Sequence, residues 1–132
     1  MTDDNPSGTL RVLVVDDQAD SADSLRLVME LMGHEALATY SGPSALAIAA
    51  EFKPQVIFTD VQMPRMGGVE LARRLRELPG LENVVIVAAT ATNISDDRLA
   101  GHETLFEAWL HKPYGLAELE ALMTRFLFLS RG

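Results

Sequence analysis

Residues 12–17 read Val-Leu-Val-Val-Asp-Asp, an unbroken apolar run that ends in two adjacent carboxylates. A continuous run of mostly β-branched residues predicts a strand that is buried on both faces. Similar runs recur at residues 56–59, 84–89 and 108–111, and a weaker, alanine-rich run covers 35–40. These five runs predict a sheet whose two faces are both covered by other elements.

Helical patterns fill the segments between these runs, because apolar residues there recur three and four positions apart. In the first segment Asp20 is expected to cap the helix and Gly33 to follow its end. The expected helices cover residues 20–32, 44–51, 71–78, 95–105 (with Ser95 as a cap) and the segment after Gly115. Strands that alternate with helices predict an α/β fold: a flavodoxin-like, doubly wound parallel sheet of order 2-1-3-4-5 with five helices.

The chain has 132 residues, of which 48% are hydrophobic and 23% charged, and this composition predicts one globular domain. We expect a disordered lead at residues 1–9 and a folded domain at 10–129. The chain has no cysteine, which excludes disulfides, thiolate metal sites and a cysteine nucleophile. Arginines 73, 74 and 76 are expected on a solvated helix face.

Acidic residues outnumber basic ones by 19 to 11, and the net charge is −8. This balance argues against a basic surface that binds nucleic acid. No apolar run approaches the length of a membrane span, and the polar, acidic first residues are unlike a signal peptide. We therefore expect a cytoplasmic protein with neither nucleic acid nor membrane as a partner.

Carboxylates follow two of the predicted strands. Asp16 and Asp17 follow the first strand and Asp60 follows the third. In the expected strand order these two strands are neighbours, and their carboxyl ends open the crevice where such folds bind ligands. Carboxylates this close repel one another unless a positive charge offsets them. A hard divalent cation, Mg²⁺ or Mn²⁺, takes oxygen ligands of this kind.

Two further polar residues end the remaining strands at the same edge. Thr90 ends the fourth strand and offers a hydroxyl donor, and Lys112, one of only two lysines, ends the fifth. Carboxylates, a divalent cation and a lysine together suit phosphoryl transfer to a carboxylate, because the reaction needs mainly positioning and charge neutralisation.

With these residues the chain resembles the receiver domain of two-component response regulators, and its length is similar to that of single-domain, chemotaxis-type regulators. The resemblance covers residues 10–128 and depends on the joint order of its motifs. These motifs are Val-Val-Asp-Asp at 14–17, Asp-Val-Gln-Met-Pro at 60–64 with Gly67 and Gly68, Thr-Ala at 90–91, and Lys-Pro at 112–113.

The resemblance implies a role for each acidic residue. Asp60 corresponds to the phosphoacceptor, which also ligates the metal. Asp17 corresponds to a direct Mg²⁺ ligand, and Asp16 to an acidic partner that often acts through water. The backbone carbonyl of Gln62 corresponds to a further metal ligand.

The resemblance also implies a phosphoryl-binding and switching set. Thr90 corresponds to the hydroxyl that moves toward the phosphoryl group, and Lys112 to the lysine that pairs with it. Trp109 corresponds to an aromatic residue that turns inward on activation. Gln62 and Thr92 stand near the position of the attacking water, so they are expected to tune dephosphorylation.

Three residues depart from the family pattern, and the first is Gly67, which stands where the family often has Asp before Gly68. The family usually has Tyr or Phe where this chain has Trp109, and the larger ring is expected to hinder inward packing. Leu105 stands at a turn where the family commonly has glycine, and a left-handed turn is costly for any other residue. We therefore expect the end of the 95–105 helix to be reshaped.

The resemblance implies a stand-alone receiver that accepts a phosphoryl group on Asp60 from a sensor histidine kinase or a histidine phosphotransfer protein. Such a domain is not an enzyme; it promotes only its own phosphotransfer and autodephosphorylation. The expected output surface for a downstream protein combines the 95–105 helix, the 108–111 strand and the last helix. A homodimer is also compatible with the family.

Three alternatives stay open at this point. The chain can be the receiver module of a hybrid histidine kinase or phosphorelay, or a degenerate receiver that binds a partner without phosphorylation. It can also be a Mg²⁺-dependent small-molecule phosphatase with Asp60 as nucleophile. Against the phosphatase, Gln62 stands where such an enzyme needs a second aspartate.

Overall fold

The computed structural model describes residues 9–91 and 103–131, and in this part of the chain five strands form one parallel sheet of order β2-β1-β3-β4-β5. The predicted sheet and its strand order are therefore confirmed. The strands are β1 (Arg11–Val15), β2 (Glu35–Thr39), β3 (Val56–Thr59), β4 (Val85–Thr90) and β5 (Ala108–His111).

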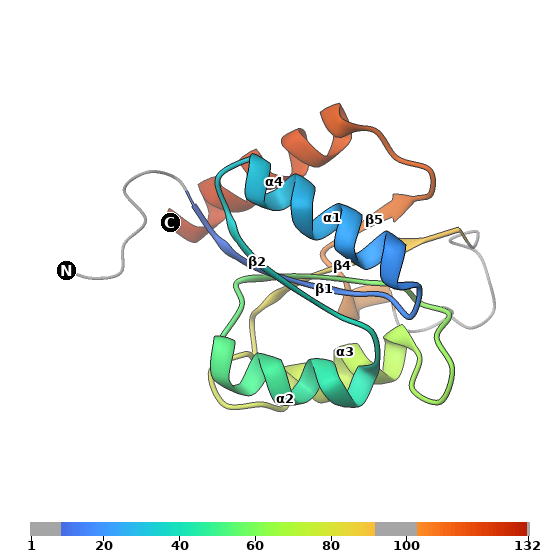
Figure 1. Cartoon of the computed structure of the whole chain (residues 1–132). Coiled ribbons are helices and arrows are strands. Elements are labelled where there is room, and N and C mark those ends of the chain that lie inside the picture. The colour runs from blue at the N-terminus through green and yellow to red at the C-terminus, as the bar shows by residue number, and fades with distance from the viewer. Residues whose placement is uncertain (1–8, 92–102, 132) are drawn as a thin grey trace.

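Helices cover both faces of the sheet: α1 and α4 lie on one side, and α2 and α3 on the other (Figure 1). They are α1 (Ala19–Leu31), α2 (Gly42–Phe52), α3 (Gly68–Arg76) and α4 (Leu116–Arg131), with a short 3₁₀ helix η2 (Glu103–Leu105) before β5. The described residues thus contain four α-helices rather than the expected five. The fifth expected helix, with its cap Ser95, lies outside the described residues except for its end in η2, and so does the expected lead except for Thr9. None of the described helices has the length and apolar character needed to cross a bilayer.

The central strands are buried because successive residues point to opposite faces, and helices cover both. Val12 and Val14 pack in one core with Phe126 of α4, whereas Leu13 and Val15 pack in a second core with residues of α3. The first core also contains Leu25, Met29, Phe58 and Met123, and the second contains Ile57, Leu71, Leu75 and Ile86.

The expected cap of the first helix is wrong. Gln18, not Asp20, occupies the N-cap, and Asp20 lies in the first turn of α1. The side chain of Asp16 accepts a hydrogen bond from the Gln18 amide at 3.0 Å, so the acidic loop itself supports the start of the helix. Gly33 follows the helix with φ +98°, as expected of a glycine at this position.

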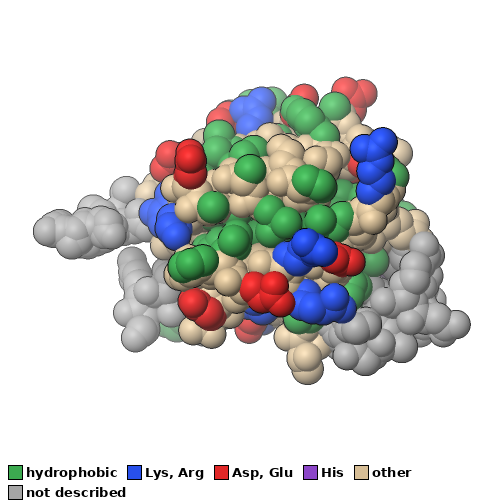
Figure 2. Space-filling view, turned by 90° about the horizontal axis from the view of Figure 1, so that it is seen from below, with side chains coloured by type: hydrophobic (Ala, Val, Ile, Leu, Met, Phe, Trp, Pro, Cys, Tyr) green, Lys and Arg blue, Asp and Glu red, His purple; other side chains and the backbone are tan. Residues whose placement is uncertain are grey.

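The second helix starts two residues earlier than expected. Ser41 caps α2, because its Oγ accepts a hydrogen bond from the Ser44 amide, and Pro43 fits the first turn. Only one of the eleven residues of α2, Glu51, is charged, whereas α3 carries an acidic residue and three arginines. Figure 2 shows this side of the molecule, with hydrophobic side chains across the middle and charged side chains around them.

Arg76 corrects the expectation of a fully solvated arginine face on α3. Arg73 and Arg74 are exposed, but Arg76 is half-buried. Its guanidinium donates hydrogen bonds to the backbone carbonyls of Glu82, Val84 and Leu105. This difference is absent from the helical pattern, because the acceptors belong to segments that only tertiary packing brings to α3.

A buried histidine joins the start of β1 to the start of β2. His34 is 7% exposed, and its Nδ1 accepts a hydrogen bond from the Leu10 amide at 3.0 Å. Burial lowers the pKa of His34 below its ordinary value of 6.5. The imidazole is therefore a packing residue that is neutral near pH 7.

We expect His34 to make the protein less stable in weak acid. As the pH falls below 6.5, the unfolded chain takes up a proton at this site while the native state does not, so the free energy of unfolding decreases. This contribution is limited to about 1.4 kcal/mol per pH unit. Urea unfolding of His34→Asn between pH 7.5 and about 5 should lack this contribution. The same substitution at the exposed His111 should keep it, and equal pH profiles for the two variants would contradict the assignment.

Candidate functional site

The backbone places three charged side chains at one edge of the sheet. The Asp16 amide donates to the carbonyl of Thr39, and the Asp60 amide donates to that of Val15, so both residues continue the ladder just beyond β1 and β3. The Lys112 amide donates to the carbonyl of Thr90 and extends β5 in the same way. Because all strands run parallel, the three side chains meet at the carboxyl edge.

Lys112 bridges the two carboxylates that follow β1 and β3. Its Nζ lies 2.8 Å from Oδ2 of Asp16 and 3.4 Å from Oδ2 of Asp60. Burial alone would lower the pKa of Lys112, but the hydrogen bond to Asp16 and the charges of both carboxylates together raise it. The ammonium therefore stays charged and offsets part of the repulsion between the acids.

Asp16, Asp17 and Asp60 form a cluster that fits a divalent cation. One carboxylate oxygen from each lies within 4.8 Å of the others. Asp16 already uses Oδ1 for the Gln18 amide and Oδ2 for Lys112, whereas Asp17 is exposed. Three hard oxygen donors with excess negative charge suit Mg²⁺ or Mn²⁺, and the exposed Asp17 is the member of the cluster that is most accessible to a cation.

The loop after β3 fixes the orientation of Asp60. The Gln62 amide donates to Oδ1 of Asp60 at 3.1 Å, and the Gly68 amide donates to the carbonyl of Val61 at 2.9 Å. A Cβ atom on Gly68 would overlap the backbone carbonyl oxygen of Asp60. Only glycine therefore allows α3 to start this close to the acidic cluster.

The remaining residues predicted for the site are Thr90, Trp109 and Thr92. Thr90 is buried at the end of β4 and is joined to Lys112 by the backbone hydrogen bond. Trp109 is half-buried on the side of α2 and α3, where its ring packs against Phe106 with centroids 4.8 Å apart. Thr92 lies outside the described residues.

Leu105 does not adopt a left-handed turn. Among the described residues other than glycine, only Lys53 and Arg65 have positive φ, and Leu105 ends the 3₁₀ helix η2. The backbone here uses a 3₁₀ turn where a glycine would permit a left-handed one.

Tyr114 is a site residue that the sequence reasoning missed. It lines a small cavity together with Asp16, Asp60 and Lys112, and burial raises the pKa of its phenol. It also lines a larger, mostly apolar hollow of about 740 Å³ between α1 and α4. Its place two positions after Lys112 is the only signal in the sequence that could have indicated this role.

Comparison with known families identifies the chain. The model of the response regulator receiver domain matches residues 12–124. The chain belongs to this family. Receiver domains are phosphoacceptor signalling domains of two-component systems rather than classical enzymes; they interact with sensor histidine kinases and bind Mg²⁺ in an acidic pocket.

Individual relatives agree with this assignment. The chain is 39% identical to the transcriptional regulatory protein PrrA of Mycobacterium tuberculosis over 111 residues, which cover 84% of this chain and 47% of PrrA. The chain thus spans about half the length of the curated relatives it matches. It is 26% identical to the chemotaxis protein CheY4 of Vibrio cholerae, with a TM-score of 0.82 over 89% of this chain and 98% of the other.

A third similar structure contains a metal ion. The receiver domain of the sensor histidine kinase PA1611 from Pseudomonas aeruginosa has a magnesium ion coordinated in its active site cleft. It is 23% identical to this chain, with a TM-score of 0.81 over 90% of this chain and 98% of that domain. At this identity the likeness shows the shared fold alone.

We expect Mg²⁺ to stabilise the folded chain through the acidic cluster. A ligand that binds only the native state, at a hundred times its dissociation constant, adds about 2.7 kcal/mol to the free energy of unfolding. Asp17→Asn should lose most of this gain, measured as the increase in Tm on adding Mg²⁺. Glu51→Gln removes one exposed negative charge from α2 and should keep it. An Asp17→Asn variant that responds like the unchanged protein would exclude Asp17 as a ligand.

Proposed function

We propose that Asp60 accepts a phosphoryl group from the phosphohistidine of a sensor histidine kinase or histidine phosphotransfer protein, in a reaction that depends on Mg²⁺ or Mn²⁺. The observation that carries the proposal is the ammonium of Lys112 between Asp16 and Asp60, with Asp17 in the same cluster. We further propose that residues 10–129 form this receiver domain and that it acts in the cytoplasm.

In the transfer step a carboxylate oxygen of Asp60 bonds to phosphorus while the bond from phosphorus to the donor imidazole nitrogen breaks. The electron pair of that bond goes to the imidazole, and an aspartyl phosphate results. Lys112 is already close to Oδ2 of Asp60, so its charge pairs with the oxygens of the arriving group. A bound Mg²⁺ supplies the additional positive charge that this transfer requires.

Asp16 and Gln62 position the reacting groups. Asp16 holds Lys112 with the shorter of its two contacts and ties the same carboxylate to the start of α1. The amide of Gln62 fixes Oδ1 of Asp60. We assign the metal to Asp17 and Asp60, to Asp16 directly or through water, and to the backbone carbonyl of Gln62.

The donor can approach over the apolar hollow beside Lys112. This hollow lies between α1 and α4, and its walls include Leu25, Val28 and Leu119. An apolar wall next to a charged site suits a protein partner that brings one phosphorylated histidine to Asp60. We therefore propose that the kinase or phosphotransfer protein docks here.

Phosphorylation is proposed to shift the chain toward a second conformation. Thr90 moves toward the phosphoryl group, and Trp109 leaves its present packing against Phe106. Such a shift requires that the phosphoryl group interact differently with the two conformations. The output surface consists of the 95–105 segment, β5 and α4, on which Leu116 and Phe128 are exposed apolar residues.

The partner on the output side is proposed to be a separate protein, or a second copy of this chain in a dimer. The net charge of −8 favours a protein rather than a nucleic acid. A receiver that works as one module of a hybrid kinase or a longer phosphorelay protein would use the same site. The half-length match to PrrA keeps this alternative beside the stand-alone receiver.

We expect acetyl phosphate with Mg²⁺ to label the chain on Asp60. The product should be an acyl phosphate, stable in acid and labile in base, and mass spectrometry should locate it. Asp60→Asn should abolish the label, whereas Lys112→Met should slow its formation because the phosphoryl oxygens lose a paired charge. Label that persists in Asp60→Asn would show that the acceptor is assigned wrongly.

The side chain of Gln62 is expected to set how long the phosphoryl group stays. It is exposed beside Asp60, where its amide can orient an attacking water. Gln62→Ala should therefore lengthen the lifetime of the phosphorylated form, measured as loss of label after the donor is removed. Thr92→Ala is expected to change the same lifetime, because Thr92 is also expected to tune dephosphorylation. Gln18→Ala, which shortens another exposed glutamine next to the cluster, should leave the lifetime unchanged. Equal lifetimes in all variants would remove Gln62 and Thr92 from the mechanism.

A further inference from the structure

Arg76, at the end of α3, ties together two segments that are far apart in the sequence. Its Nη1 donates to the carbonyls of Glu82 and Val84 at 3.2 and 2.9 Å, and its Nη2 donates to the carbonyl of Leu105 at 2.6 Å. The first two acceptors lie in the loop that leads into β4, and the third ends η2. One guanidinium therefore connects α3 to the approaches of both β4 and β5.

These contacts are costly to lose. The side chain is half-buried, so the guanidinium has given up part of its hydration. Burial lowers the pKa of Arg76, and the charge of Glu107 opposes this shift. Hydrogen bonds from a charged donor are stronger than those between neutral groups. A buried cation without such acceptors would be strongly unfavourable.

The contact with Leu105 leads directly to the aromatic pair of the proposed switch. Phe106 is the next residue, is 7% exposed and packs against Trp109. Leu105 and Trp109 pack against the same core. The Glu107 amide then donates to the carbonyl of Ile86 and joins this segment to β4. Arg76 therefore acts one residue away from the side chain on which Trp109 rests.

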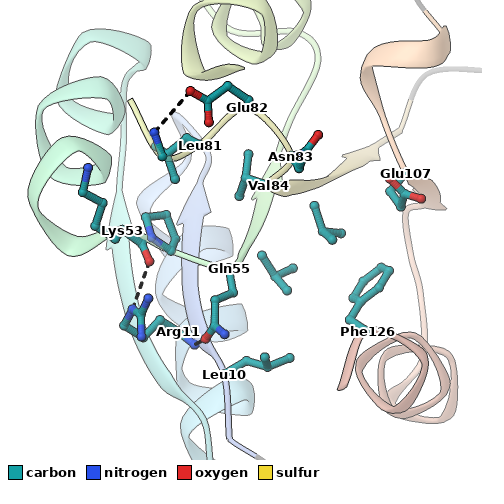
Figure 3. A pocket seen from close by; sticks show the side chains of 14 residues that line it. Leu10, Arg11, Lys53, Gln55, Leu81, Glu82, Asn83, Val84, Glu107 and Phe126 are labelled. Atoms are coloured by element: carbon teal, nitrogen blue, oxygen red, sulfur yellow. Dashed lines mark hydrogen bonds between the residues drawn. The ribbon is translucent and has the colours of Figure 1, made fainter. Parts of the chain in front are cut away.

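The contacts of Arg76 lie at the edge of the sheet opposite to the acidic cluster. The carbonyls of Glu82 and Val84 belong to residues that line a cleft of about 480 Å³ at the amino ends of the strands. Figure 3 shows Glu82 and Val84 on one side of this cleft and Glu107 on the other. Asp60 follows the carboxyl end of β3, so an effect of Arg76 on switching cannot come from contact with the phosphoryl site.

We propose that Arg76 is a positioning residue of the conformational switch, because it holds the segment before β5, and with it the Phe106–Trp109 pair, in the arrangement of the unphosphorylated chain. The inference rests on the proposed function. Loss of the three hydrogen bonds weakens this arrangement and lowers the free-energy cost of the second conformation. A phosphoryl analogue on Asp60 then needs a smaller difference in affinity between the two conformations to shift the equilibrium. A lower concentration of the analogue therefore produces the same shift.

The test uses Trp109, the only tryptophan of the chain, as a fluorescent reporter. Beryllofluoride, which mimics a phosphoryl group on aspartate, is titrated at fixed Mg²⁺. Arg76→Met should reach its midpoint at a concentration about fivefold lower than the unchanged protein. Without beryllofluoride, its Trp109 should be quenched less readily by acrylamide, because a larger fraction of the molecules already has Trp109 turned inward. Arg76→Lys keeps the positive charge but loses the planar guanidinium that donates from two nitrogen atoms. Its midpoint should lie between those of the unchanged protein and Arg76→Met.

Arg73→Met is the matched control, because Arg73 is an exposed arginine on the same helix. It should behave like the unchanged protein. If Arg76→Met does not fold, Arg76→Lys decides the question. Unchanged midpoints and quenching in the folded Arg76 variants would show that Arg76 only stabilises the fold, and would overturn the inference. A Trp109 signal that ignores beryllofluoride in the unchanged protein would also overturn it.

Labelling of Asp60 by acetyl phosphate, measured by mass spectrometry on the same samples, distinguishes a failure of the proposed function from a failure of the proposed role of Arg76. An unlabelled wild-type chain would refute the proposed function itself. Labelled Asp60 together with a normal Trp109 response in every Arg76 variant would refute only the role of Arg76. Label together with the shifted midpoints would support both.

Discussion

The contact of Lys112 with Asp16 and Asp60 is the interaction on which the rest of the site depends. Two carboxylates at the ends of neighbouring strands repel each other, and a third follows in Asp17. The ammonium, delivered by a strand from the other half of the sheet, offsets this repulsion at 2.8 and 3.4 Å. Because the order of the strands brings β1 and β3 together at the point where the winding reverses, the topology itself concentrates negative charge there. Lys112 offsets part of this negative charge, and a bound divalent cation would offset more of it.

Much of the fold could be predicted because its information is local. The apolar run of β1, with two carboxylates directly after it, marks both a buried strand and its carboxyl end. The cap of α1 could not be predicted in this way. Both Gln18 and Asp20 lie near the start of the helical pattern. Gln18 is the N-cap in the folded chain, where its amide donates a hydrogen bond to the side chain of Asp16. Arg76 repeats the lesson, since the helical pattern places Arg74 and Arg76 at similar angles on either side of the buried face of α3, yet only Arg76 is half-buried.

The acidic cluster was predictable because the backbone alone determines the positions of its members. Each member follows a strand, and the carboxyl ends of parallel strands lie at one edge of the sheet. Tyr114 was not, because its place at the site depends on how the chain turns after Lys112 and packs beside α4. The family resemblance supplied the roles of Thr90 and Trp109, which the residues alone do not indicate. Their half of the mechanism stays a proposal, whereas the convergence of Asp16, Asp17, Asp60 and Lys112 is a feature of the structure.

The sheet also separates the molecule into two layers with separate cores. Val12 and Val14 belong to the layer of α1 and α4, and Leu13 and Val15 to the layer of α2 and α3. Residues that recognise a signalling partner on one layer can therefore diverge without repacking the other. Duplicated copies of such a domain could acquire new partners through substitutions on α1 and α4 alone, while the opposite layer and the edge that carries the acidic cluster are inherited intact.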